Sequence, residues 1–128
     1  MTTTVMIVDD QRATRLGLAL MIGKADDLRV IAQAENGRDA LDQLAEIERR
    51  RTPRPDVVLM DVRMPVLNGI DATAAITRKH PGVKVLVLTT YDQDDYAFGA
   101  LGAGASGFLL KDTRTTDLHQ ALRAVAAG

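Results

Sequence analysis

Polar residues that could do chemistry stand where the apolar runs of this sequence end, and the acids among them could bind a metal ion. They are Asp9 and Asp10, then Asp61, Thr89 and Lys111. If the runs form neighbouring parallel strands, these side chains share the carboxyl edge of the sheet, where open α/β sheets bind their ligands. Ionised carboxylates a few Å apart repel one another, and a hard cation such as Mg²⁺ relieves that repulsion. The sequence therefore predicts a Mg²⁺ site for which Asp10, Asp61 and a backbone carbonyl are suitable oxygen ligands.

The elements that must position these residues are five short runs rich in Val, Ile and Leu. They cover residues 4–8, 29–34, 56–60, 84–89 and, more weakly, 107–110. Near-continuous apolar runs are typical of strands that are covered on both faces. Helical spacing lies between the runs, which predicts an α/β sheet with right-handed crossovers and helices on both faces.

Apolar side chains at helical spacing predict which face of the first two helices is buried. For the first helix they are Leu16, Leu20 and Met21, and for the second they are Leu41, Leu44 and Ile47. Turn signals agree with the element limits: "RTPRP" precedes the third strand, "LNG" at 67–69 opens the third helix, and "HPG" at 80–82 closes it.

Composition narrows the class of protein. The chain has 128 residues, of which 46% are apolar and 26% charged, so we expect one globular domain. A net charge of −1 gives no general electrostatic attraction to nucleic acid or to a membrane, and no cysteine is present. The sequence shows neither a leader nor an apolar run of membrane-spanning length, which predicts a cytoplasmic protein with no membrane partner. Two Phe, two Tyr and no Trp leave few faces for stacking a flavin or a base.

Four motifs in this order resemble the receiver domain of two-component response regulators. They are "VDD" at 8–10, "DVRMPVLNG" at 61–69, "TT" at 89–90 and "GASGFLLKD" at 104–112. The resemblance covers essentially the whole chain and implies a single receiver domain over residues 1–128. It implies a flavodoxin-like, three-layer fold: a doubly wound, five-stranded parallel sheet in the order 2-1-3-4-5.

The resemblance also implies a role for each acid. Asp61 is the expected phospho-acceptor and a metal ligand. Asp10 is expected to bind Mg²⁺ directly, Asp9 to act on it largely through water, and the backbone carbonyl of Arg63 to complete the protein ligands. A carboxylate nucleophile attacks phosphorus to give an acyl phosphate, while positive charges neutralise the transferring oxygens.

Phosphoryl-binding and switch residues follow from the same resemblance. Thr89 meets the phosphoryl group and Lys111 ion-pairs with it. Phe108 fills the space that Thr89 vacates, and because Phe lacks a hydroxyl the switch is read by burial. Arg63 and Tyr91 occupy positions that tune the lifetime of the acyl phosphate, and both are large enough to shield phosphorus from water. The implied output surface is the fourth helix, the fifth strand and the fifth helix.

The expected partners also follow the family. A histidine kinase would donate the phosphoryl group, and the first helix, with Arg12 and Arg15 near the acids, is a candidate docking face for it. The ending "LLKD" resembles the subfamily that carries a C-terminal helix-turn-helix. We therefore expect an output domain outside this chain, DNA contact only through that domain, and a homodimer as a candidate consequence of phosphorylation.

Two other functions fit parts of the pattern. A haloacid-dehalogenase-type phosphatase also uses an Asp nucleophile with Mg²⁺, but it places a second acid where this chain has Arg63. A flavodoxin-like flavin carrier needs a Ser/Thr/Gly-rich loop after the first strand, where this chain has "DDQRATR". We expect a phospho-acceptor domain rather than a turnover enzyme.

Two further features of the sequence, the residue after Lys111 and the glycines of the fourth helix, each predict a local property of the backbone. Asp112 follows Lys111 where many receivers have proline, which predicts a trans bond. Gly99 and Gly102 predict a soft fourth helix, since glycine weakens a helix interior.

The remaining charged and titratable residues are expected at the surface. His80 and His119 lack metal-ligand spacing. A basic run near the end of the second helix is expected to be solvated, with cations that complement the helix dipole; it consists of Arg49, Arg50, Arg51 and Arg54.

Overall fold

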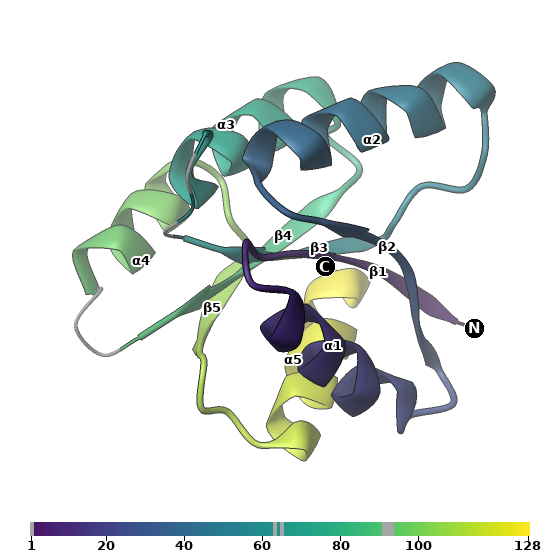
Figure 1. Ribbon diagram of the computed structural model, residues 1–128, viewed down its shortest axis with the longest axis vertical. Coiled ribbons are helices and arrows are strands. Elements are labelled where there is room, and N and C mark those ends of the chain that lie inside the picture. Colours follow the sequence, from purple (N-terminus) through teal and green to yellow (C-terminus); the bar gives the residue numbers. More distant parts are fainter. Residues whose placement is uncertain (1, 63, 65, 91–93) are drawn as a thin grey trace.

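A five-stranded parallel sheet forms the centre of the molecule in the computed structural model, which describes residues 2–62, 64, 66–90 and 94–128 (Figure 1). The strands are β1 (Thr3–Val8), β2 (Leu28–Ala34), β3 (Val57–Asp61), β4 (Lys84–Thr89) and β5 (Gly107–Leu110). Their order is β2-β1-β3-β4-β5, and every neighbouring pair is parallel. The predicted fold class and strand order are confirmed.

Helices cover both faces of the sheet. They are α1 (Arg12–Gly23), α2 (Gly37–Arg50), α3 (Gly69–Lys79), α4 (Asp94–Gly102) and α5 (Thr115–Ala127). Figure 1 shows α1 and α5 on one side of the sheet and α2, α3 and α4 on the other. Side chains of β1 alternate between these layers: Val5 and Ile7 belong to the core cluster with α1 and α5, whereas Met6 and Val8 belong to the cluster with α2 and α3.

The predicted buried face of α1 is wrong for Leu16 and Leu20, whereas Met21 is partly buried and packs against the core. Leu16 is 50% exposed and Leu20 is 73% exposed, whereas Leu18 and Ile22 are buried. The helix carries apolar residues nearly all round, so two different helical stripes are available. Spacing alone does not choose between them, because the choice depends on the strands that the helix meets. For α2 the prediction holds, since its stripe lies in the core.

Asparagine caps begin α2 and α3. Asn36 Oδ1 accepts a hydrogen bond from the Asp39 backbone N–H at 2.8 Å, and Asn68 Oδ1 accepts one from the Asp71 N–H at 2.9 Å. These bonds satisfy amide groups that have no partner within the first turn of a helix. The "LNG" and "HPG" signals mark the start and end of α3 as predicted.

Gly69 brings the start of α3 against the end of β3. Its N–H donates to the Val62 carbonyl at 2.8 Å, and a Cβ at this position would lie 2.2 Å from the Asp61 carbonyl oxygen. Only glycine allows this approach without a shift of the backbone. The third helix consequently supports the strand end that carries Asp61.

Both histidines depart from the expected surface position. His119 on α5 is 9% exposed, and its Nε2 lies 2.6 Å from the Met21 carbonyl of α1. The His80 side chain is largely buried, and its Nδ1 lies 3.2 Å from a carboxylate oxygen of Glu48. Each partner lies on another element, which is why the neighbouring sequence does not reveal it. Within the described ranges, no helix is long and apolar enough to cross a membrane.

Candidate phosphoryl-acceptor and metal site

The register of the central strands brings the three acids together. Val8 pairs with Met60 across β1 and β3, so Asp9 follows its strand beside Asp61. One carboxylate oxygen from each of Asp9, Asp10 and Asp61 lies within 4.8 Å of the others. Asp9 and Asp61 are buried, and Asp10 is exposed. The acids therefore converge at the carboxyl edge of the sheet, as predicted.

Groups from the start of α1 hold Asp9 in place. Its Oδ1 accepts a hydrogen bond from the Gln11 N–H at 2.9 Å, and its carbonyl accepts one from Arg15 Nη1 at 2.7 Å. Sequence reasoning placed Arg15 near the acids but missed this bond. The available signal was spacing, because Arg15 lies one helical turn beyond Gln11 and so faces the same strand end.

Two carboxylate oxygens of the site stand out because they find no hydrogen-bond donor in the described part of the chain. Asp9 Oδ2 and Asp61 Oδ1 are buried and accept none from any described residue. Lys111 Nζ lies 2.9 Å from Asp61 Oδ1 and 3.9 Å from Asp9 Oδ2. Its approach to Asp61 is close enough for an ion pair but is not aligned as a hydrogen bond, so this contact is electrostatic.

Burial sets the protonation behaviour of both acids. It raises the pKa of Asp61 by more than the ammonium of Lys111 lowers it. It likewise raises the pKa of Asp9, against the lowering effect of the Gln11 N–H, and the charge of Asp61 raises the Asp9 pKa further. The cluster therefore holds more negative charge than the described residues balance.

This donor set fits a hard divalent cation. Carboxylate oxygens from Asp9, Asp10 and Asp61 converge, and the orphaned buried oxygens are groups that a cation would satisfy. The Arg63 carbonyl, the further predicted ligand, lies outside the described residues. So does Tyr91, the other residue predicted to tune the phosphorylated lifetime.

The remaining predicted residues lie on β4 and β5 or directly after them. Thr89 is fully buried at the end of β4, and the Lys111 N–H donates to its carbonyl at 2.8 Å, which joins the two strand ends. Phe108 pairs with Val87 in the sheet and is 43% exposed. No cis peptide bond occurs among the described residues, so the bond from Lys111 to Asp112 is trans as predicted.

The order of the strands, the acid cluster and the lysine at the end of β5 together define a receiver-type fold and site. The family model of the response regulator receiver domain matches residues 5–123. This chain belongs to that family, as the sequence predicted.

Known relatives agree with this assignment. The chain is 44% identical over 124 residues to the transcriptional regulatory protein LnrK of Bacillus subtilis, covering 97% of this chain and 54% of LnrK. Its structure is similar to the signal receiver domain of the response regulator NarL from Mycobacterium tuberculosis, with a TM-score of 0.87 and 31% identity over 99% of this chain and 98% of that one. A LuxR-family response regulator from Aurantimonas has the same TM-score and identity, covering 100% of this chain and 87% of that one. The chain spans about half the length of the curated relatives it matches.

Proposed function

We propose that Asp61 accepts a phosphoryl group from the phosphohistidine of a histidine kinase. The observation that carries this proposal is the contact of Lys111 Nζ with Asp61 Oδ1, 2.9 Å apart, in a cluster whose buried carboxylate oxygens accept no hydrogen bond from the described residues. Asp61 is a buried nucleophile with one cation beside it and two further acids close by. In this arrangement a metal ion and the ammonium can share the negative charge that a phosphoryl group adds.

In the transfer, a carboxylate oxygen of Asp61 attacks phosphorus. The new O–P bond forms as the P–N bond to the donor imidazole breaks, and the released electron pair stays on the imidazole nitrogen. The Lys111 ammonium is placed to neutralise charge on the transferring oxygens, and the Thr89 hydroxyl to donate to one of them. When bound, Mg²⁺ would supply further positive charge there. The groups proposed to hold it are Asp10 and Asp61 directly, Asp9 through water, and the Arg63 carbonyl.

The conformational output would run through the face formed by α4, β5 and α5. Phe108 is 43% exposed, so its ring has surface to lose when Thr89 moves toward the phosphoryl group. Burying part of a Phe ring provides a driving force of the size that shifts a two-state equilibrium. We infer that this shift controls a DNA-binding domain outside the chain, with homodimer formation as one route, in the cytoplasm and with no membrane partner.

The lifetime of the acyl phosphate would depend on Arg63 and Tyr91. Both side chains are large, and shielding of phosphorus would slow attack by water. Replacing both residues with Ala should shorten the phosphorylated lifetime. An unchanged lifetime in the double variant would remove this role from both positions.

Phosphorylation by a small donor tests the acceptor. The chain is incubated with acetyl phosphate, with and without Mg²⁺, and its mass is measured; a phosphoryl group adds about 80 Da. We expect one Mg²⁺-dependent adduct that Asp61→Asn abolishes. Asp42→Asn is the matched control, since Asp42 is an exposed acid on α2 outside the acid cluster, and it should leave the adduct unchanged.

The same experiment separates the rival functions. Sustained release of phosphate over many turnovers, without an accumulating adduct, would favour the phosphatase. Absence of both an adduct and phosphate release, with every donor and with Mg²⁺, would contradict both the acceptor and the phosphatase. Family membership and the lack of an acid at position 63 favour a single-equivalent acceptor over both the phosphatase and the flavin carrier.

A further inference from the structure

A pocket lies at the amino end of the strands, opposite the acidic edge. It has a volume of about 220 Å³ and opens between the C-terminal ends of α2 and α3 and the segments that lead into β3 and β4. Its apolar lining includes Leu44, Ile47 and Val83, of which Leu44 and Val83 are buried in the core. The receiver chemistry described above uses none of these residues.

The charged rim of this pocket is mainly positive. Arg51, Arg54 and Lys79 line it, with Glu48 as the single acid among its described lining residues. Glu48 is already engaged, because its Oε2 lies 3.2 Å from His80 Nδ1. The three cations make no ion pair with another described residue.

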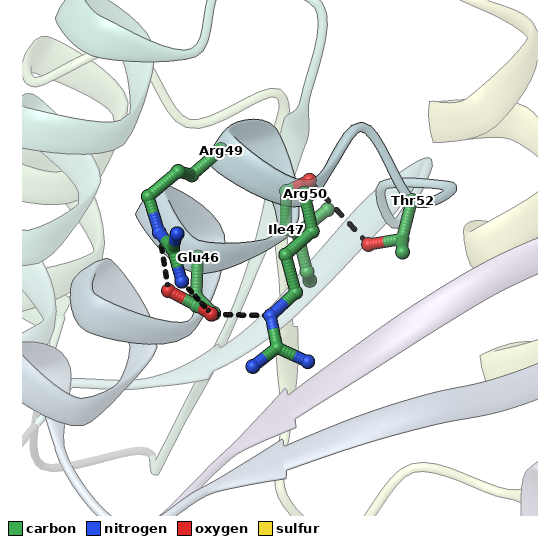
Figure 2. A network of polar contacts seen from close by, with 5 residues as sticks. All are labelled: Glu46, Ile47, Arg49, Arg50 and Thr52. Atoms are coloured by element: carbon green, nitrogen blue, oxygen red, sulfur yellow. Dashed lines mark hydrogen bonds and ion pairs between the residues drawn. The ribbon is translucent and has the colours of Figure 1, made fainter.

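Arg49 and Arg50, which precede the rim residue Arg51, differ from the rim cations because they form ion pairs with Glu46. Figure 2 shows Glu46 holding both Arg49 and Arg50, with nitrogen-to-oxygen distances of 2.5 Å. The same view shows Thr52 Oγ1 donating to the Ile47 carbonyl at 3.4 Å, a bond that returns the chain over the end of α2. The basic run is therefore divided between Arg49 and Arg50, which share the carboxylate of Glu46, and the cations that border the pocket.

Two of these cations, Arg51 and Arg54, are next to a special feature of the backbone. Arg51 ends α2 with φ at 54°, in the left-handed region where glycine is the usual residue. The Arg54 guanidinium lies directly against Gly82, where a Cβ would come within 1.9 Å of Nη2. The left-handed residue is an ordinary way to end a helix, whereas the packing against Gly82 leaves the Arg54 guanidinium room at the rim of the pocket.

We propose that this pocket binds a small amphipathic carboxylate. Its hydrocarbon part would occupy the apolar floor formed by Leu44, Ile47 and Val83. Its carboxylate would meet the guanidinium of Arg54 and the ammonium of Lys79. The volume lies below that of pockets for drug-sized ligands, about 300–1,000 Å³, so the ligand has about six to ten non-hydrogen atoms. A ligand of that size in an open pocket binds with a Kd on the order of 1 mM.

An NMR titration of the whole chain with hexanoate tests this proposal. Hexan-1-ol and hexylammonium serve as neutral and cationic analogues with the same hydrocarbon part, and acetate serves as the anion without it. We expect saturable amide shifts within residues 47–54 and 79–83 for hexanoate only. Binding that is equally strong for hexanol or for acetate would overturn the ligand class, and hexanoate shifts that do not saturate or that map elsewhere would overturn the site.

Two matched double variants test the role of the rim. Arg54→Gln with Lys79→Gln should raise the hexanoate Kd about tenfold, since both cations meet the carboxylate. Arg49→Gln with Arg50→Gln removes the same charge from the engaged pair and should change Kd less than about twofold. All four residues are exposed, so the remaining amide spectrum reports whether the fold is kept. Equal loss in both variants would show attraction by net charge alone and overturn the site.

Discussion

Replacing Asp61 with Asn should stabilise the metal-free chain. The carboxylate oxygens of Asp9 and Asp61 lie within 4.8 Å, so their charges repel by about 3.5 kcal/mol at an effective dielectric constant of about 20. Burial of the Asp61 charge costs several kcal/mol more. The attraction of Lys111 Nζ, 2.9 Å from Asp61 Oδ1 on a side chain that is one-third exposed, offsets about 6 kcal/mol of this cost at most. The balance is a net destabilisation of about 1–2 kcal/mol that Asp61→Asn removes.

Chemical and thermal denaturation in EDTA, read by circular dichroism, measure this difference. We expect Asp61→Asn to raise the free energy of unfolding by about 1–2 kcal/mol, which corresponds to about 3–6 °C in Tm for a domain of this size. Lys111 stays solvated in the variant, because its side chain is 33% exposed. Asp42→Asn, which replaces an exposed acid on α2, should change the free energy of unfolding by less than about 0.5 kcal/mol.

Mg²⁺ should make the wild type more stable than Asp61→Asn, which is the reverse of the order expected in EDTA. A cation that binds only the folded chain, at about a hundred times its Kd, adds about 2.7 kcal/mol to the stability of the wild type. Asp61→Asn loses a ligand and should gain much less. A variant that is less stable than the wild type in EDTA, or an equal gain from Mg²⁺ in both proteins, would refute the charge argument.

The pH dependence of this stability difference has a definite sign. Burial raises the folded-state pKa of Asp61 above its ordinary value of 3.8, so between those two values the folded chain binds more protons than the unfolded chain. Ionised Asp61 therefore opposes folding at neutral pH, and protonation relieves that effect as pH falls through the folded-state pKa. The advantage of Asp61→Asn in EDTA should shrink over the same interval. An advantage that is constant down to pH values near 3.8 would contradict the raised pKa.

Further predictions concern the helices. Gly102→Ala meets nothing within 4 Å and should stabilise α4 by up to about 1 kcal/mol, whereas Gly99→Ala puts a Cβ 3.0 Å from Ile70 Cδ1 and should gain less; amide exchange across α4 measures both. Without phosphate, α4 amides should exchange faster than those of α2, and equal protection would refute the soft helix. His119→Ala should lower the free energy of unfolding by about 1–3 kcal/mol, because the Met21 carbonyl loses its 2.6 Å partner. An unchanged denaturation midpoint would show that this contact contributes nothing to stability.

The strands and the acidic site were predictable for a common reason. A strand buried on both faces is a continuous apolar run, and the first polar residue after such a run stands at the sheet edge. Asp9, Asp61 and Thr89 each close or follow such a run, so one rule located all three. That the first and third strands are neighbours did not follow from the runs themselves. The resemblance to a family supplied it, and the pairing of Val8 with Met60 confirms it.

Features that depend on contacts between distant elements were not predictable. The apolar pattern of α1 allows more than one buried face, and only packing on the sheet selects Leu18 and Ile22 over Leu16 and Leu20. His119 looked like a surface residue because its partner, a carbonyl near the end of α1, lies 98 residues away in the chain. Such partners leave no periodic or local signal in the sequence.

Backbone strain marks the surroundings of both sites. Among the described residues other than glycine, only Arg51 and Val66 have positive φ, at 54° and 73°. Arg51 lines the basic pocket, and Val66, a β-branched residue for which this conformation is unfavourable, lies in the connection from β3 to α3 that follows Asp61. Such conformations persist only where the surrounding structure enforces them, and they gather where chain geometry serves binding. The buried carboxylates at the acidic edge are also unfavourable by themselves, and a bound cation would account for them. Arg54 and Lys79, beside Arg51, make no ion pair with a described residue, and a small carboxylate would supply a partner for both.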